Sequence, residues 1–401
     1  MKCRVCDQSD FSEVLDLGLQ PWGNHFLSED ELGSEPKYPL RVVYCNKCST
    51  AQLDYTVKKE VMFTDHTYLS GMASTLIHHF DEIAKNVDKQ FFAEKSSKKI
   101  LDIGSNDGTQ LKSYQNLGYN VLGIDSCKKA AKIANENGVN TLCKFFNESL
   151  AKKIDQKFDV INAAGVFFHL EELHSVTRGI KHLLADKGVF VIQCIYMKSI
   201  VDNGAFDQIY HEHLLFYNIE TLDFLLKKHG LALFDVEISP IHGGSLIAYA
   251  THADKAVPSL RLFALQQKEK ESGCNTLSYY QKFAQKVEES KKRNLDFLEK
   301  CKKEGKVVYG MGAPVKGNTL LNYFGIGKNY LSALIEKNPL RKNLFSPGTH
   351  LPIWLEEELT SFPDVYYVLA WNFKKEILKK NQSLIEKGVE FFFPIQIGGE
   401  S

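Results

Sequence analysis

The stretch KKILDIGSNDGTQL, residues 98 to 111, joins an apolar strand to a glycine-rich turn and then to a helix. A tight glycine turn after the first strand of a parallel sheet lets a ligand approach the backbone closely. Beyond it, short β-rich runs such as YNVLGIDS and KFDVINAAGVFFHL alternate with helical stretches such as KKAAKIANENG. Strands that alternate with helices predict an α/β fold with a Rossmann-like parallel sheet wound by right-handed crossovers.

A chain of 401 residues is at least twice the usual domain size of roughly 100–200 residues, so two or three domains are expected. Residues 1 to 60 contain few periodic segments and predict a small, loop-rich module. Residues 76 to 95 have helical spacing, and residues 258 to 304 predict long charged helices. KVVYGMGAPVKGNTLLNYF then opens a second βαβ pattern. We therefore expect three parts with these boundaries: residues 1–70, 71–255 and 256–401.

Charge and composition exclude several kinds of partner. The chain has 49 basic and 49 acidic residues, whereas binding to a phosphate backbone requires a broad positive surface. No apolar run approaches the roughly 20 residues that span a bilayer, and the start MKCRVCDQSD lacks the apolar core of a signal peptide. We therefore expect a cytoplasmic protein with no nucleic-acid or membrane partner. The sequence does not predict the oligomeric state.

Four of the nine cysteines form two CxxC pairs, Cys3 with Cys6 and Cys45 with Cys48. Each pair can offer two thiolates to one tetrahedral Zn²⁺ at about 2.3 Å, and four ligands leave no open position for catalysis. A structural zinc would stabilise a segment that has little apolar burial of its own. The alternative is two unrelated pairs of buried or redox-active cysteines.

The glycine-rich turn favours one ligand class. A dinucleotide site needs GxGxxG, whereas GSNDG lies among acidic side chains that would repel phosphate and suit a cationic ligand bearing an amino-acid group. Asp125 ends the next strand about 20 residues later, where it can accept hydrogen bonds from ribose hydroxyls. The pattern fits S-adenosylmethionine, and a merely structural turn is the alternative. The candidate donor-binding residues here are Asp102, Gly104, Ser105, Asn106, Asp107 and Asp125.

Asn162 and His169 follow the strand FDVIN and should lie at the same sheet edge. Asn162 is a candidate for donor binding. His169 is a candidate for substrate binding, with a structural histidine as the alternative.

FDQIYHEHLLFY, residues 206 to 217, places Tyr210, His211, Glu212 and His213 in consecutive positions. Histidines at i and i+2 lack the spacing of a zincin helix, so a metal site is disfavoured. On a strand or extended loop, neighbouring side chains point in different directions, so one can act while another orients it. An imidazole is the usual general base, and a nearby carboxylate or phenol can set its tautomer. A polar turn with solvated histidines is the alternative.

Over nearly its whole length, the sequence resembles sugar C-methyltransferases that modify nucleotide-linked deoxysugars. The resemblance is carried by the paired CxxC module, DIGSNDG, FDQIYHEH, HGGSL at residues 242 to 246, GAPVKGNTLLNYFGI and PGTHLPI. It implies a Rossmann-like class I methyltransferase domain between a zinc module and a second Rossmann-like domain. It also implies methyl transfer from S-adenosylmethionine to a carbon next to the ketone of a nucleoside-diphosphate 4-keto-deoxysugar.

The resemblance also implies individual roles. His213 would be the base that removes the proton next to the ketone, with Tyr210 and Glu212 supporting it and Tyr68 adjoining the reacting centre. Ser70 would contact the methyl donor, and His242 the substrate. Two rival functions remain open: an O- or N-methyltransferase on a nucleotide sugar, and a non-catalytic nucleotide-sugar-binding protein.

The last domain contains a second glycine loop, GMGAPVKGNTLL, between a strand and a helix. Its backbone amides could hold phosphate near Gly312, with Lys316 adding positive charge and Asn318 a donor. Glu336 ends the next strand, where it would bind a ribose or remain an exposed carboxylate. This domain is therefore predicted to bind the nucleotide end of the substrate.

Overall fold

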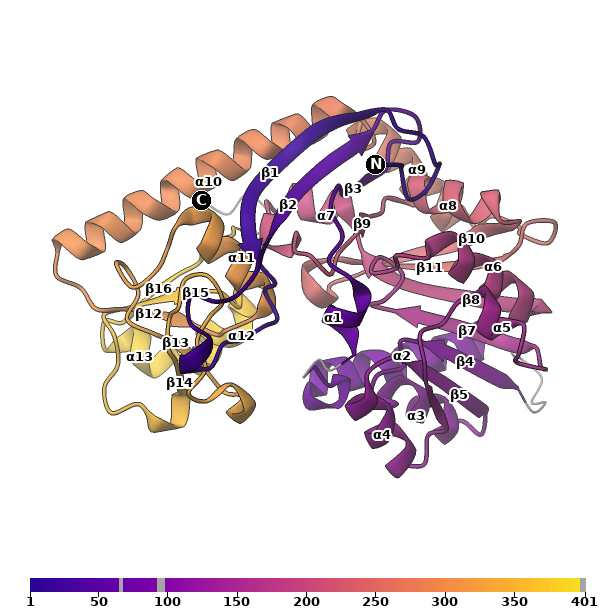
Figure 1. Cartoon of the computed structure of the whole chain (residues 1–401), viewed down its shortest axis with the longest axis horizontal. Coiled ribbons are helices and arrows are strands. Elements are labelled where there is room, and N and C mark those ends of the chain that lie inside the picture. The colour runs from indigo at the N-terminus through magenta and orange to yellow at the C-terminus, as the bar shows by residue number, and fades with distance from the viewer. Residues whose placement is uncertain (65–67, 92–97, 397–401) are drawn as a thin grey trace.

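The computed structural model describes residues 1–64, 68–91 and 98–396, apart from the side chain of His242. Three β-sheets follow one another along the chain. A two-stranded ribbon from the N-terminal part runs between two α/β lobes, and the long helix α10 (Leu277–Lys303) extends along one side of the molecule (Figure 1). Among the described residues, no helix combines the length and apolarity needed to cross a membrane.

The N-terminal part is more regular than the loop-rich module that the sequence predicted, so that prediction was wrong. Its antiparallel sheet has the order β1-β2-β3-β9, and β1 and β2 form a long ribbon. Apolar side chains of this ribbon, such as Leu17 and Val42, are buried in a core shared with the other domains. The ribbon therefore needs no core of its own. The strands are β1 (Phe11–Pro21), β2 (Lys37–Cys45), β3 (Ala51–Leu53) and β9 (Leu215–Phe216).

The middle domain has a seven-stranded sheet with the order β10-β11-β8-β7-β4-β5-β6. The five strands from β4 to β8 are parallel, as predicted, and β11 runs antiparallel between β8 and β10. The chain starts at the central strand β4 and winds outward both ways, which creates a ligand crevice at the carboxyl ends of the strands. The strands are β4 (Lys99–Ile103), β5 (Asn120–Asp125), β6 (Thr141–Cys143), β7 (Phe158–Ala164), β8 (Leu184–Ile195), β10 (Leu231–Ser239) and β11 (Ser245–His252).

Helices cover this sheet, and the connecting helix expected over residues 76 to 95 is α2 (Ser74–Phe91). The others are α1 (Lys59–Phe63), α3 (Thr109–Asn116), α4 (Lys128–Glu136), α5 (Glu148–Ala151), α6 (Leu173–Leu183), α7 (Met197–Asp202) and α8 (Ile219–Lys228). Short 3-10 turns are η1 (Glu29–Glu31), η2 (Ser70–Met72), η3 (Phe206–Gln208) and η4 (Ile241–Gly243).

The C-terminal domain is a second parallel sheet with the order β14-β13-β12-β15-β16. The predicted charged helices are α9 (Leu260–Ser272) and α10, which lead into it. The sheet comprises β12 (Val308–Met311), β13 (Leu334–Glu336), β14 (Ile353–Leu355), β15 (Val365–Val368) and β16 (Glu390–Phe392). Its helices are α11 (Val315–Phe324), α12 (Lys374–Lys380) and α13 (Gln382–Glu386), with η5 (Pro339–Arg341), η6 (Glu356–Glu358) and η7 (Trp371–Phe373) between strands.

One apolar core joins the three parts. It runs from Leu17 of β1 through Phe206 of η3 to Leu320 of α11. The Tyr210–His213 segment lies inside this junction, between η3 and β9. It is a turn, in which the carbonyl of Tyr210 accepts the backbone N–H of His213 at 2.9 Å, and so it is not a strand.

Candidate functional site

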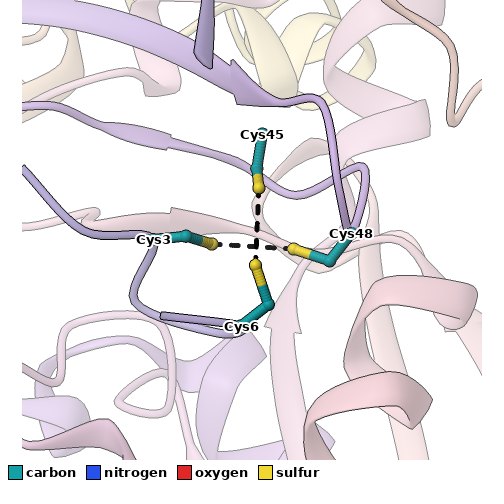
Figure 2. Close-up of side chains that lie close together, drawn as sticks. All are labelled: Cys3, Cys6, Cys45 and Cys48. Atoms are coloured by element: carbon teal, nitrogen blue, oxygen red, sulfur yellow. Dashed lines mark hydrogen bonds between the residues drawn. The ribbon is translucent and has the colours of Figure 1, made fainter. Parts of the chain in front are cut away.

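The four cysteines of the two CxxC pairs converge on one point, with their sulfur atoms facing one another (Figure 2). The Cys3 and Cys48 sulfurs are 3.6 Å apart, those of Cys6 and Cys45 are 3.5 Å apart, and all four lie within 4.8 Å. Four sulfurs at about 2.3 Å from a tetrahedral ion would be separated by about 3.8 Å. The donor set therefore fits a closed structural zinc, which would tie the N-terminus to the end of β2.

The glycine loop between β4 and α3 has the strained backbone that a close ligand approach requires. Gly104 has φ +73° and Asn106 has φ +51°. A Cβ atom on Gly104 would lie 3.0 Å from the side chain of Val166. Asp125 holds the loop, because its Oδ2 accepts the backbone N–H of Asn106 at 2.8 Å and its Oδ1 accepts that of Cys127 at 2.8 Å.

Buried polar atoms around this loop have no hydrogen-bond partner among the described residues. They are Asp102 Oδ1, Ser105 Oγ and Asn162 Nδ2. Burial raises the pKa of Asp102 well above its usual value, and the charge of Asp125 adds to the effect. Buried polar groups are nearly always hydrogen-bonded in folded proteins, so these atoms indicate a missing ligand. An acceptor beside a donor suits the amino-acid end of S-adenosylmethionine, so the residues fit this group.

The segment from Tyr68 to Gly71 is bonded to the same loop. Asn106 accepts the N–H of Ser70 at 2.9 Å through Oδ1 and donates to the carbonyl of Tyr68 at 3.1 Å. Asp107 Oδ2 accepts the N–H of Gly71 at 2.8 Å. Although 51% of the Tyr68 surface is exposed, burial of its phenol within the site and the nearby Asp107 raise the pKa of Tyr68 to about 12. Residues 65–67, immediately before Tyr68, lie outside the described part.

His213 is held by the backbone. Its Nδ1 lies 2.7 Å from the carbonyl oxygen of Gln208. Because a carbonyl only accepts, Nδ1 carries the proton, and the lone pair that can accept another proton is on Nε2. The ring of Tyr210 lies on that of His213, with centroids 3.8 Å apart, and the His169 ring is stacked at 5.2 Å. Burial raises the pKa of Tyr210 well above its usual value, with contributions from Glu212 and Tyr68.

The other two members of the turn face different partners. Glu212 Oε1 accepts the indole N–H of Trp22 at 2.8 Å, so Glu212 bonds to the N-terminal part and not to the His213 ring. Burial raises the pKa of Glu212 to about 7. His211 Nε2 lies 3.3 Å from the carbonyl of Tyr38, and burial lowers the pKa of His211 to about 4. Sequence reasoning found the four residues but not these partners.

The side chains predicted to bind the nucleotide end are bonded within the protein. Asn318 donates to the carbonyl of Gly23 at 2.7 Å. Lys316 donates to Asn372 Oδ1 at 2.8 Å and lies 4.0 Å from Asp207 Oδ2. Burial lowers the pKa of Lys316 to about 8, although Asp207 raises it.

Glu336 is not the exposed carboxylate that the sequence allowed, and it already has partners within the protein. Its Oε2 accepts the N–H of Ala313 at 3.0 Å and lies 3.3 Å from Arg341 Nη1. Gly312 has φ +84°, as a tight turn requires. The side chain of His242 lies outside the described residues.

Three residues at the site were missed by sequence reasoning: Trp22, Gln208 and Trp371. Trp22 and Trp371 are two of only three tryptophans in the chain, which is the one signal that could have drawn attention to them. The carbonyl of Gln208 has no sequence signal, because every residue has a carbonyl.

Three family models match consecutive parts of the chain. A putative zinc binding domain matches residues 3–63, a methyltransferase domain matches residues 76–236, and a C-methyltransferase C-terminal domain matches residues 240–396. The sheet order, the glycine loop and the unpartnered polar atoms agree with the second of these models. The middle domain is therefore a class I, S-adenosylmethionine-dependent methyltransferase domain with a Rossmann-like fold, and the Cys₄ cluster belongs to a zinc-binding domain.

Relatives narrow the class further. The C-methyltransferase NovU of Streptomyces niveus is 29% identical over 401 residues, which covers 98% of this chain and 95% of that protein. The ubiquinone biosynthesis O-methyltransferase of Glaesserella parasuis serovar 5 (strain SH0165) is 31% identical over 107 residues, or 24% of this chain and 45% of that protein. The three models and the full-length similarity to NovU together show that this chain is an S-adenosylmethionine-dependent C-methyltransferase with an N-terminal zinc-binding domain.

Solved structures match part of the chain. The CcbJ methyltransferase from Streptomyces caelestis has a TM-score of 0.33 at 17% identity and covers 43% of this chain and 89% of that one. The plantazolicin methyltransferase BpumL in complex with SAH has a TM-score of 0.36 at 18% identity and covers 45% of this chain and 85% of that one. The assignment as a C-methyltransferase rests on the models and on the similarity to NovU.

Proposed function

We propose that this enzyme methylates the carbon next to the ketone of a nucleoside-diphosphate 4-keto-deoxysugar, with His213 as the base that removes the proton from that carbon. The observation that carries the proposal is the bond from His213 Nδ1 to the Gln208 carbonyl at 2.7 Å, which puts the proton-accepting lone pair on Nε2. A C-methyltransferase needs a carbon nucleophile, and a ketone supplies one when a base removes its neighbouring proton. Positioned proton transfer contributes typically about 10²–10⁴-fold.

The phenols of Tyr68 and Tyr210 can stabilise the enolate oxygen that forms in the same reaction. Because the pKa of Tyr68 is raised to about 12 and burial raises the pKa of Tyr210 well above its usual value, both phenols stay protonated near neutral pH. Each can therefore donate a hydrogen bond to the enolate oxygen that forms as His213 takes the proton. A single donor of this kind contributes about 10²–10³-fold. His169, stacked beside His213, would line the space for the sugar ring.

The methyl donor would lie across the glycine loop. Bound S-adenosylmethionine supplies an electrophilic methyl group. Asp102 Oδ1 and Asn162 Nδ2 would bind its amino-acid end, and Asp125 would accept from its ribose while holding Asn106. Hydrogen bonds from the loop to the Tyr68–Gly71 segment connect this donor site to the phenol that adjoins the reacting centre.

The proposed division of labour follows the three predicted parts, residues 1–70, 71–255 and 256–401: a zinc module, a donor-binding domain and a domain for the nucleotide end. In the last domain, Asn318 and Glu336 are already bonded within the protein. The amino end of α11 therefore remains for a diphosphate, with Lys316, which donates to Asn372, and His242 as further proposed contacts.

Deuterium exchange tests the proposal. The zinc-loaded enzyme would be incubated in D₂O with a nucleoside-diphosphate 4-keto-6-deoxyhexose, with and without S-adenosylmethionine, and followed by mass spectrometry. We expect exchange next to the ketone without the donor, and a mass gain of one CH₂ group with it. His213→Gln should lower both rates by about 10²–10⁴-fold.

The matched control is His252→Gln, which replaces a half-buried histidine on β11 whose ring faces the carbonyl of Ala185. It should leave both rates near those of the wild type. Methyl transfer that persists without His213 would point to an O- or N-methyltransferase and would reject the enolate route. Binding of the sugar nucleotide with neither exchange nor methyl transfer would favour a non-catalytic binding protein.

A further inference from the structure

The start of α11, in the C-terminal domain, contacts two backbone segments that hold the side chains of the Tyr210–His213 turn. One segment is η3, which ends at Gln208, the residue that binds His213. The other follows β1 and contains Trp22, the residue that binds Glu212. Neither contact reaches the turn directly, so any influence on His213 and Glu212 passes through these segments.

The first contact centres on Asp207, which immediately precedes Gln208 and is wholly buried. Its Oδ2 accepts the indole N–H of Trp371 at 2.6 Å and lies 4.0 Å from the ammonium of Lys316. Its Oδ1 has no partner among the described residues. When a buried carboxylate has so few partners, loss of any one of them strongly destabilises its position. Trp371 and Lys316 therefore determine where η3 lies, and with it the carbonyl of Gln208.

The ring of Trp371 is itself closely packed. The ammonium of Lys316 lies 3.6 Å from the centroid of this ring. On another side, a Cβ atom on Gly243 would lie 2.8 Å from the indole, so only glycine fits there. Rings of Phe206 and Phe324 also meet at 5.0 Å, which joins η3 to α11 by apolar contact. The Trp371–Asp207 bond is thus formed between two elements that have little room to shift.

The second contact centres on Gly23. The side chain of Asn318 donates to its carbonyl at 2.7 Å. A Cβ atom on Gly23 would lie 3.2 Å from the carbonyl oxygen of Val315, so the chain runs close against the first turn of α11. Trp22 precedes Gly23 and donates to Glu212 at 2.8 Å. The same helix turn therefore fixes the donor to Glu212 as well.

We propose that Trp371, Lys316 and Asn318 are positioning residues. Trp371 and Lys316 fix the orientation of the His213 ring, acting through Asp207 and the Gln208 carbonyl. Asn318 fixes the position of Glu212, acting through Gly23 and Trp22. The inference rests on the proposed role of His213 and assigns the C-terminal domain a part in orienting the base. Residues at the start of α11 would then both contact the nucleotide end of the substrate and help to hold the base in place.

The test compares two variants that each remove one buried donor from the C-terminal domain. Trp371→Phe removes the N–H that binds Asp207 and keeps an aromatic ring. Tyr367→Phe removes the hydroxyl that donates to Asn294 Oδ1 at 2.7 Å, where both residues are wholly buried, and serves as the control. The readouts are kcat and KM for deuterium exchange next to the ketone, S-adenosylmethionine affinity and Tm.

We expect Trp371→Phe to lower kcat by about 10–100-fold while KM changes by less than about twofold, because the base is misplaced but substrate binding is retained. Tyr367→Phe should lower Tm to a similar extent and leave kcat near wild type. Trp22→Phe should lower kcat independently, so the double variant should show the product of the two effects. Equal loss of kcat in Trp371→Phe and Tyr367→Phe, or no loss in Trp371→Phe, would overturn the inference.

A second pair of variants covers the case in which Trp371→Phe does not fold. Asp207→Asn keeps an acceptor for Trp371, whereas Asp207→Leu does not, so the first should retain at least about tenfold more exchange activity. Equal activities would overturn the inference. Failure of the proposed function is distinguishable, because then His213→Gln itself would leave exchange unchanged.

Discussion

The two parallel sheets each place a glycine loop after their first strand, and the loops begin alike. In the middle domain, Asp125 at the end of the second strand accepts the N–H of Asn106 at 2.8 Å. In the C-terminal domain, Glu336 at the end of the second strand accepts the N–H of Ala313 at 3.0 Å. An acidic residue therefore anchors the first loop in both sheets.

The loops differ in what satisfies the remaining polar groups. Around the first loop, Asp102 Oδ1 and Asn162 Nδ2 have no partner among the described residues. Around the second, Glu336 is paired with Arg341 at 3.3 Å, and Asn318 is bonded to Gly23. Since buried polar groups need partners, we expect a ligand to complete the first loop, whereas the protein itself largely completes the second. The same topology would thus give the proposed donor site in one domain and a junction between domains in the other.

Zinc removal should have the largest effect, and it should disturb the second glycine loop much more than the first. Cys45→Ser or chelation removes a ligand set whose metal supplies about 10–16 kcal/mol in structural zinc sites, so the N-terminal part should lose its fold. The segment after β1 that contains Gly23 would no longer pack on α11, and we expect methyl transfer to fall at least about 100-fold. S-adenosylmethionine affinity, measured by calorimetry, should change by less than about threefold.

Cys143→Ser, at an exposed cysteine outside the cluster, is the control for the loss of a thiol. Donor affinity that collapses together with methyl transfer would contradict the separation of the two loops.

Removing the anchoring carboxylate should affect ligand binding in the first loop only. Asp125→Ala removes two hydrogen bonds to a charged group, each worth about 1.5–3 kcal/mol, and should weaken S-adenosylmethionine binding at least about 100-fold. Glu336→Ala should lower Tm, because Arg341 loses its partner, without changing donor affinity. Calorimetric titration of both variants checks this, and equal effects on donor binding would show that the loops are not distinct.

Glu212 should make stability depend on pH. Its pKa is about 7 in the folded protein against an ordinary value of 4.5, so the folded state holds an extra proton between these pH values. Glu212 should therefore contribute a fall of up to roughly 3 kcal/mol in the free energy of unfolding as pH rises from about 4.5 to 7. His211, whose pKa burial lowers to about 4, contributes a rise over much of the same range, so the test compares the free energy of unfolding of the wild type with that of Glu212→Gln, by urea unfolding at pH 5 and pH 8. This difference should change with pH, whereas the difference between the wild type and Glu136→Gln, at an exposed carboxylate, should not; a Glu212→Gln difference that is the same at both pH values would refute the assignment.

Substitution of a glycine in each loop should give the smallest difference between the two loops. Gly104→Ala and Gly312→Ala both force alanine into the left-handed region, at about 1–2 kcal/mol each. An added Cβ also meets Val166 at 3.0 Å in the first loop but only Ala370 at 3.3 Å in the second. Gly104→Ala should thus be the less stable variant and the only one with weakened donor binding. Thermal unfolding and calorimetry of the pair test this, and a reversed order would count against the packing argument.

Parts of the site that depend on local spacing were predictable. The Cys₄ cluster was predicted from two CxxC pairs and is confirmed by the structure, whereas the donor site, predicted from DIGSNDG together with a carboxylate about 20 residues later, stays a prediction. The Tyr210–His213 turn was identified as a site, but its geometry was not, because the partners of Glu212 and His213 are an indole 190 residues away and a backbone carbonyl. The ribbon of β1 and β2 was also missed, since its apolar side chains are buried against other domains.

The sequence alone determined the α/β architecture and the four cysteines of the cluster, and it supplied the candidate donor loop and the residues that could provide a base. Those features depend on periodicity, on short fixed spacings and on the chemistry of single side chains. Only the tertiary structure decided which neighbour holds each member of the turn, and that the second glycine loop is filled by Asn318 and Gly23. The physical reason is that a buried polar group takes whichever partner packing brings within hydrogen-bond distance, and packing depends on residues far apart in the chain.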